Sequence, residues 1–308
     1  MRTLFERTIL HIFRAAEKTI DNILIVLFAV TAFFMIYLAV QNNAVINEAS
    51  TEQYRAYKPS SDNRMSFDEL HELNPEVIGW LTIRDTPVDY PVVQGNNNSK
   101  YINTSALGEF SLSGALFLDS RSSAAFDDTL SIIYGHNMVG NVMFGDFYLY
   151  ENREYFDSHL DGTVFFGGEY HKLTVFAFLK ADGYDFELYD TGLTDEGFKD
   201  WIEKLKERAV NVTDSVPSEG PVLMLSTCSS EETNGRTVLA AVIGEKTEVI
   251  VRGPRITKIG AAPLYRVRST LYPVMIIIGA AAALILLTWL WAAWKKRRET
   301  ENDDLGNE

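Results

Sequence analysis

The sequence predicts a mainly β globular body flanked by two transmembrane helices. Of its 308 residues, 46% are apolar, which is enough for a sizeable core and excludes a disordered or collagen-like chain. No charged residue occurs from Asn22 to Asn47 or from Leu271 to Trp294. At ~1.5 Å per residue, either run can cross a ~30 Å hydrocarbon layer as a helix. Between the two runs, short apolar stretches alternate with clusters of Gly, Asn, Asp and Ser, a pattern typical of β-strands.

Charges beside the two apolar runs predict the orientation of the chain. Basic residues precede the first run, and the cluster Lys295-Lys296-Arg297-Arg298 follows the second. Positively charged flanks stay cytoplasmic, so we expect a protein of the cell membrane with both termini on the cytoplasmic side and the body on the extracellular side. The expected segments are a cytoplasmic N-terminus (1–21), transmembrane helices (22–42 and 271–294) and a cytoplasmic tail (295–308).

Two observations qualify this topology. Arg266 and Arg268 lie on the predicted outer side, against the charge rule, although the four-residue cluster is the stronger signal. The first apolar run has the alternative of a cleaved signal peptide. An uncleaved anchor is favoured because the run is long for a signal sequence and no A-x-A cleavage site follows it.

The body is expected to comprise a helical lead-in (43–75), a β domain (76–252) and a linker back to the membrane (253–270). A helix, Thr194–Ala209, carries a single apolar stripe and has acidic residues in its first turn. Eight strands and this helix favour a β-barrel or a β-sandwich with the helix laid on it. The predicted strands are Val77–Ile83, Val88–Val93, Gly114–Asp119, Leu130–Tyr134, Thr163–Phe166, Leu173–Leu179, Val222–Thr227 and Thr237–Val251.

Charge and composition exclude several classes of function. The net charge is −14, and an acidic body of this kind repels phosphate backbones, so we expect no nucleic-acid partner. No Asp, Glu and His cluster has the spacing of a metal site, so we expect neither a metal nor another cofactor. The tract Gly183–Tyr189 alternates aromatic and acidic residues, and we interpret it as a half-buried strand or loop rather than a ligand platform.

Cys228 is the only cysteine, so it cannot form an internal disulfide. A buried thiol that acts as a small apolar side chain is the simplest interpretation. The strand Val222–Thr227, however, ends immediately before Cys228, which places the thiol at the rim of the sheet. Gly235-Arg236 begins the next strand. If the two strands form a hairpin, Arg236 and Cys228 lie side by side; alone, Arg236 would be interpreted as a solvated charge.

His136 is the third candidate. It follows the strand Leu130–Tyr134 and the glycine Gly135, whereas the other four histidines lie on the cytoplasmic side of the anchor, in the early helix or in polar turns. A structural histidine is the usual interpretation of a single such residue. Here a Cys, a His and an Arg all occur at strand boundaries, which favours a shared site.

Together these residue types suit acyl transfer. A thiol beside cationic groups favours its thiolate, which is the nucleophilic form. A protonated imidazole can donate its proton to a leaving amine. A guanidinium, which keeps its charge, can stabilise an oxyanion or hold substrate carbonyl groups.

These motifs resemble the sortases, the membrane-anchored cysteine transpeptidases of Gram-positive bacteria. Leu225-Ser226-Thr227-Cys228 is similar to the TLxTC signature, with Met224 in place of its first Thr, and Gly235-Arg236 and Tyr134-Gly135-His136-Asn137-Met138 are similar to the Arg and His segments. Further segments resemble class B in particular: Asn74–Leu81, Tyr90–Gln94, Gly114–Asp119, Met143–Asp146 and the helix Thr194–Ala209. The likeness covers about residues 66–250.

The resemblance implies an eight-stranded sortase-type barrel with peripheral helices. It further implies that Cys228 cleaves the C-terminal sorting signal of a secreted protein and holds the acyl group as a thioester. An amine from a cell-wall precursor or a pilin lysine would then release it. Catalytic roles fall to Cys228, His136 and Arg236, and substrate contacts to Thr227, Ser226 and Asn137.

One feature departs from the common class B pattern. A second span with a Lys-Lys-Arg-Arg flank is more usual in class C sortases, which polymerise pilins, but no lid with the class C aromatic motif precedes the barrel. Wall anchoring and pilus assembly therefore both stay open. Two other functions compete: a hydrolytic cysteine peptidase using the same residues, and a non-catalytic surface module that binds a peptide or wall component.

Overall fold

The computed structural model describes residues 2–60, 65–138, 142–229 and 233–248. The first element is one long helix, α1 (Arg2–Glu48). Its segment Thr19–Leu38 has a mean hydropathy of 2.2 and buries none of its residues against the rest of the chain. It is the one helix in the described ranges that is long and apolar enough to cross a membrane. The expected linker, second span and tail (253–308) lie outside the described residues.

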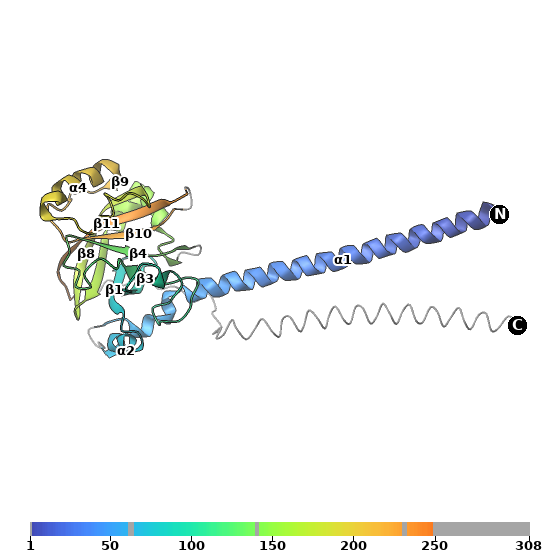
Figure 1. Ribbon diagram of the computed structural model, residues 1–308, viewed down its shortest axis with the longest axis horizontal. Helices are drawn as coiled ribbons and strands as arrows, with labels where there is room; N and C mark the ends of the chain where they lie inside the picture. The colour runs from blue at the N-terminus through green and yellow to red at the C-terminus, as the bar shows by residue number, and fades with distance from the viewer. Residues whose placement is uncertain (1, 61–64, 139–141, 230–232, 249–308) are drawn as a thin grey trace. The chain divides into compact units, whose positions relative to one another are not determined.

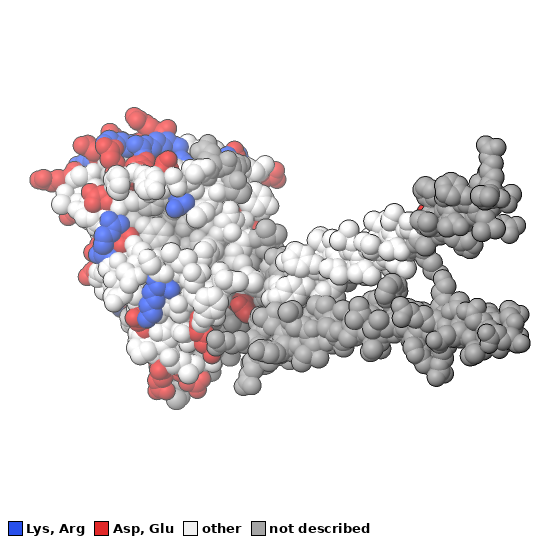
Figure 2. Space-filling model, turned by 45° about the vertical axis from the view of Figure 1, so that its right-hand side comes forward, with Lys and Arg blue, Asp and Glu red and all other residues white. Residues whose placement is uncertain are grey.

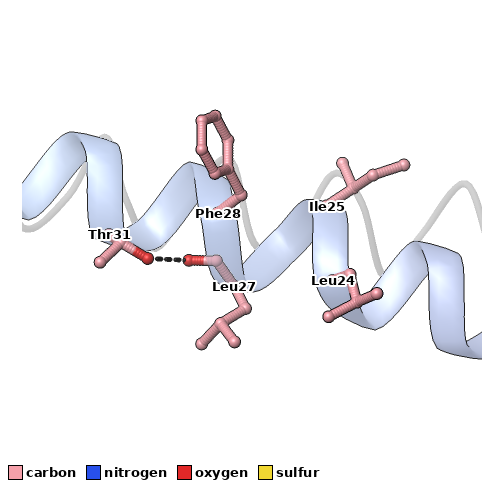
Figure 3. Close-up of a pocket in the computed structure, with 5 residues that line it drawn as sticks. All are labelled: Leu24, Ile25, Leu27, Phe28 and Thr31. Carbon is pink, nitrogen blue, oxygen red and sulfur yellow. Dashed lines mark hydrogen bonds between the residues drawn. The ribbon is translucent and has the colours of Figure 1, made fainter.

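Apolar side chains project from α1 over this candidate span. Figure 3 shows Leu24, Ile25, Leu27 and Phe28 around an apolar hollow, with the Thr31 hydroxyl donating a hydrogen bond to the Leu27 carbonyl. Because the Thr31 hydroxyl is satisfied within its own helix, it leaves the surface of the span apolar. The hollow contains none of the residues that the sequence predicts at the active site.

The body is a closed β-barrel (Figure 1). Its strands are hydrogen-bonded in the order β11-β10-β4-β3-β2-β1-β7-β8, and β8 pairs again with β11, which closes a ring of eight described strands. A ninth strand, β9 (Ala209–Val212), pairs antiparallel with β8 at Ala177–Leu179, beyond the residues of β8 that pair with β7. The barrel strands are β1 (Val77–Ile83), β2 (Asp89–Val93), β3 (Leu116–Leu118), β4 (Leu130–Tyr134), β7 (Asp161–Phe166), β8 (Glu169–Asp182), β10 (Val222–Cys228) and β11 (Gly235–Lys246).

All eight predicted strands are present, and the closed ring that they form confirms the barrel and excludes the sandwich. The prediction missed β9 and the two-residue hairpin of β5 (Asn137–Met138) and β6 (Val142–Met143), which are too short to carry an alternating pattern. The predicted amphipathic helix is α4 (Asp195–Arg208), and the Thr194 side chain caps it by accepting a hydrogen bond from the Gly197 N–H. Shorter helices are η1 (Thr51–Gln53), η2 (Arg55–Tyr57), α2 (Met65–Leu73), η3 (Lys100–Ile102), η4 (Phe147–Glu151) and α3 (Arg153–Ser158).

Two apolar clusters lie on opposite faces of β10. Leu223 and Leu225 point into the barrel cluster, whereas Val222 and Met224 join a second cluster beneath α4. Strand side chains alternate between faces, so burial on both sides explains why β10 is a continuous apolar run. On its outer surface α4 is charged, and Figure 2 shows Lys and Arg side chains gathering among acidic ones at this end of the body.

The segment after the candidate span is fastened to the barrel. Ala49 and Tyr54 are buried, the Ala49 carbonyl accepts a hydrogen bond from the Tyr90 hydroxyl at 2.8 Å, and the Tyr54 hydroxyl accepts one from the Ala106 N–H at 3.4 Å. Burial raises the pKa of Tyr54 to about 12, so this hydroxyl stays neutral at physiological pH. The lead-in is therefore an integral part of the body's packing rather than a free tether.

Asp146, just before η4, is a buried carboxyl group whose Oδ1 has no hydrogen-bond partner among the described residues. Burial raises its pKa above the ordinary value. An acid whose pKa is raised on folding destabilises the protein at pH values above that pKa, and the penalty is relieved as the pH falls through it.

We expect Asp146→Asn to increase the free energy of unfolding at pH 7 by ~1 kcal/mol, because it removes a buried charge. The gain should shrink as the pH is lowered and the wild-type carboxyl becomes protonated. Thermal unfolding from pH 7 to pH 4 measures both effects, with the exposed Asp127→Asn as the control. A wild-type chain that is more stable than the variant at pH 7 would contradict this assignment.

Candidate active site

The expected hairpin between β10 and β11 is present, and it brings Cys228 beside Arg236. The two residues are directly paired across the antiparallel ladder. Cys228 is exposed at the end of β10, and the Arg236 Nη1 lies 3.4 Å from its Sγ, in position to donate a hydrogen bond. Arg236 Nη1 also donates to the Gly235 carbonyl at 3.2 Å. The structure thus places a cationic donor in contact with the thiol, at the strand boundary where the sequence predicts it.

A second ladder brings the His136 segment to the same rim. β4 runs parallel to β10 with Tyr134 opposite Ser226, and beyond the strand the Gly135 N–H donates to the Ser226 carbonyl at 3.1 Å. Asn137 then donates from Nδ2 to the Cys228 carbonyl at 2.8 Å. His136 lies between these two contacts along the chain. The parallel pairing thus carries residues 135–137 past residues 226–228.

The imidazole of His136 is held by a backbone carbonyl rather than by the thiol. Its Nε2 lies 2.8 Å from the carbonyl oxygen of Ile102, which ends η3. A carbonyl only accepts hydrogen bonds, so this contact places a proton on Nε2 and leaves Nδ1 for proton exchange in the neutral ring. Gly135 permits the close packing here, because a Cβ on it would lie 2.5 Å from the Leu116 Cδ2 and 2.8 Å from the Phe144 Cδ2.

The three expected substrate contacts differ in their accessibility. Asn137 is exposed, whereas Ser226 and Thr227 are buried. The Ser226 hydroxyl lies 2.9 Å from the Tyr189 hydroxyl, and the Thr227 hydroxyl has no partner among the described residues. Their burial limits direct contact between a substrate and these two side chains in this state.

Residues that the sequence did not single out hold the wall next to Ser226. Arg121 binds the fully buried Asp119 through Nε at 2.9 Å and Nη2 at 2.8 Å, and Tyr134 donates its hydroxyl to the same carboxylate at 3.1 Å. Arg121 Nη2 also reaches the Tyr189 carbonyl at 3.4 Å, and the Tyr134 and Tyr189 rings stack with centroids 6.4 Å apart. The network joins β3 and β4 to the connection that follows β8.

The charge state of this network follows from its hydrogen bonds. Burial alone raises the pKa of Asp119, but the hydrogen bonds from Arg121 and Tyr134 outweigh it and lower the pKa overall. Burial raises the pKa of Tyr189 to about 12. Asp119 is therefore ionised and Tyr189 neutral at physiological pH. The described residues contain no group of three or more His, Cys, Asp and Glu side chains that could hold a metal ion.

The tract Gly183–Tyr189 follows β8 as turns rather than as a strand. Tyr189 is buried in the network, whereas Tyr184 and Phe186 are exposed. Asp185 and Glu187 pair with Arg208 and Lys204 of α4, respectively. In the sequence, only the alternation of aromatic and acidic residues marks this tract. It does not reveal which of its side chains pair with α4 and which one stacks on Tyr134.

A barrel that presents an exposed cysteine beside an arginine and a histidine segment defines a cysteine enzyme of the acyl-transfer type. No protein-family model matches the chain. Sortase B of Listeria monocytogenes is 28% identical over 223 residues, which are 70% of this chain and 86% of the relative.

Two solved structures are more similar in sequence. A class B sortase of Streptococcus pyogenes that is involved in pilus biogenesis is 35% identical, with a TM-score of 0.52, and the match covers 57% of this chain and 97% of that one. Sortase B from the type II pilus of Streptococcus pneumoniae is 36% identical, with a TM-score of 0.51, over 58% of this chain and 98% of that one. The chain belongs to the sortase family, class B, and is a cysteine transpeptidase.

We expect Asp119→Asn to lower the free energy of unfolding at pH 7 by ~2 kcal/mol, because it weakens charge-assisted hydrogen bonds to a buried carboxylate. The pKa of Asp119 is lowered on folding, so its contribution is present above the unfolded-state pKa and is lost as the pH falls through the folded-state pKa. The difference in the free energy of unfolding between variant and wild type should therefore diminish in acid. Its sign is opposite to that expected for Asp146→Asn, which stabilises the protein. Thermal unfolding against pH measures it, and a difference that is constant down to pH 3 would contradict the assignment.

Proposed function

We propose that Cys228 is the nucleophile of this transpeptidase, that His136 transfers the protons and that Arg236 stabilises the developing oxyanion. The observation that carries the proposal is the pairing of the exposed Cys228 Sγ with the Arg236 Nη1 at 3.4 Å, on a rim that residues 135–137 also reach. Asn137 is proposed to contact the substrate as well as the Cys228 carbonyl. For Ser226 and Thr227 the proposal is limited to shaping the floor of the site, in keeping with their burial.

The reaction proceeds in two steps that conserve atoms and charge. The Cys228 thiolate attacks the carbonyl carbon of the scissile peptide bond in the sorting signal. The C–N bond breaks, the leaving amine takes a proton from His136, and a thioester remains on Sγ. A second amine then attacks the thioester and loses a proton to His136. The C–S bond breaks, so that a new amide forms and the thiolate returns.

The acceptor is proposed to be a pilin lysine rather than a cell-wall precursor. Two structures that resemble this chain at 35% and 36% identity come from pilus systems, by their descriptions. The second apolar run, Leu271–Trp294, also fits a pilus role by the resemblance described above. Secreted proteins that carry a C-terminal sorting signal would be the substrates.

We further propose that α1 is an uncleaved anchor and that 271–294 forms a second span, so that both termini are cytoplasmic and the barrel is extracellular. The anchoring role is supported by the exposed apolar segment Thr19–Leu38 and by the burial of Ala49 and Tyr54 against the barrel. The helix α1 continues without a break from the candidate span into the lead-in, so cleavage after the span would release the barrel from its anchor.

The experiment is intact-mass analysis of the full chain in detergent after incubation with sorting-signal peptides and an amine. We expect an acyl adduct on the protein that a lysine-containing pilin peptide converts to ligated product, faster than a wall-precursor peptide does. Cys228→Ala should form no adduct. Conversion by water alone would instead identify a hydrolase, and equal or faster conversion by the wall-precursor peptide would overturn the proposed acceptor.

Loss of His136 or Arg236 should lower kcat by the factors typical of general acid–base catalysis and of oxyanion stabilisation, respectively. We expect His136→Ala to lower kcat by about 10²- to 10⁴-fold and Arg236→Ala by about 10²- to 10³-fold. Steady-state cleavage of the peptide that gives the adduct provides the measurement. Full activity in either variant would remove that residue from the proposed mechanism.

A further inference from the structure

The first residue after β8 lies against the side chain of Arg236. β8 and β11 are antiparallel, with Ala181 opposite Arg236 and Asp182 opposite Gly235. Beyond this ladder the Gly183 N–H donates to the Asn234 carbonyl at 2.8 Å. The hydrogen bond holds the Gly183 backbone next to the start of β11, where the Arg236 side chain leaves the strand.

The position has room for glycine but for nothing larger without movement. A Cβ on Gly183 would lie 3.1 Å from both the Cζ and the Nη2 of Arg236, and 3.2 Å from the Asn234 carbonyl oxygen. These separations are tighter than ordinary van der Waals contacts between carbon and its neighbours. The φ angle of Gly183 lies outside the left-handed region, so its backbone does not require glycine. The constraint is the space that the guanidinium occupies.

Contacts on two sides therefore fix the position of the Arg236 guanidinium. One nitrogen, Nη1, donates to the Cys228 Sγ at 3.4 Å and to the Gly235 carbonyl at 3.2 Å. The opposite side, Cζ and Nη2, packs on Gly183. A hydrogen bond weakens as its length and angle depart from their optimum, so a displacement of the guanidinium by a few tenths of an ångström is expected to weaken the contact to sulfur.

We infer that Gly183 is a positioning residue for Arg236: its missing side chain leaves the space from which the guanidinium reaches the Cys228 thiol. The inference rests on the proposed role of Arg236 beside Cys228. We assign Gly183 no contact of its own with the thiol or with a substrate. Its effect on catalysis is expected to pass entirely through Arg236.

The test measures thiol reactivity without any peptide. The full chain in detergent is alkylated with iodoacetamide at pH 7, and the rate of modification of Cys228 is followed by intact mass. The variants are Gly183→Ala, the larger Gly183→Val, Arg236→Ala and the double variant of Gly183→Val with Arg236→Ala. Gly244→Ala, on the same strand as Arg236, is the matched control, because its Cβ would make an ordinary contact at 3.5 Å with the Lys172 carbonyl oxygen.

We expect Arg236→Ala to slow alkylation by about fivefold to tenfold and Gly183→Ala by about twofold, since the first removes and the second displaces the cationic donor that contacts Sγ. Gly183→Val should approach Arg236→Ala, and Gly244→Ala should match the wild type. In the double variant, Gly183→Val should add nothing to Arg236→Ala, which is the signature of two residues acting as a unit. Thermal unfolding of each variant shows whether a slower rate reflects a loss of folding. Of the two Gly183 variants, Gly183→Ala is expected to disturb folding less, because its side chain is smaller.

Several results would overturn the inference. They are a wild-type alkylation rate in Gly183→Val, a Gly183→Val effect that persists in full without Arg236, and an Arg236→Ala rate equal to the wild type. Peptide cleavage by the same preparations reports separately on the proposed function. If the alkylation pattern is found but no sorting-signal peptide is cleaved, the proposed substrate fails while the positioning role of Gly183 stands.

Discussion

The register of β10 is the constraint on which the active site depends. The strand is hydrogen-bonded to the parallel β4 on one side and to the antiparallel β11 on the other. Its side chains are buried alternately in the barrel cluster and beneath α4. A shift by one residue would exchange these faces, so that side chains packed in one cluster would have to fit the other, and close packing on both sides therefore specifies the register. The same register sets Cys228 opposite Arg236 and carries residues 135–137 past the thiol.

Two buried carboxyl groups, those of Asp119 and Asp146, have opposite electrostatic surroundings. Asp119 accepts hydrogen bonds from Arg121 and Tyr134 and stays ionised, and through them it fastens Tyr189 beside the site. Asp146 is about as deeply buried but leaves an oxygen unpartnered, so burial alone determines its pKa. The paired carboxylate organises the wall of the site, whereas the unpaired one lowers the stability of the structure around η4.

The lead-in and the site share one supporting loop. Residues 103–114 follow Ile102, whose carbonyl holds His136, and within this loop Ser111 donates to Glu48 at 3.4 Å and Ala106 to Tyr54. The end of α1 is thus packed on the loop that begins at the histidine's backbone partner. This arrangement fixes the position of the backbone carbonyl that holds His136 relative to the end of α1.

The sequence by itself determined the eight barrel strands and α4, because short apolar runs bounded by turn residues and a helical apolar stripe report local burial directly. It also singled out Cys228, His136 and Arg236 as candidate site residues, since each stands at the end or the start of an apolar run. Only the tertiary structure decided that Asp119, Arg121 and Tyr189 support the site and that Gly183 makes room for Arg236. Their significance lies in contacts between segments far apart along the chain. The burial of Ser226 and Thr227 was likewise decided by the strands and side chains that cover β10, which no pattern within the strand reveals.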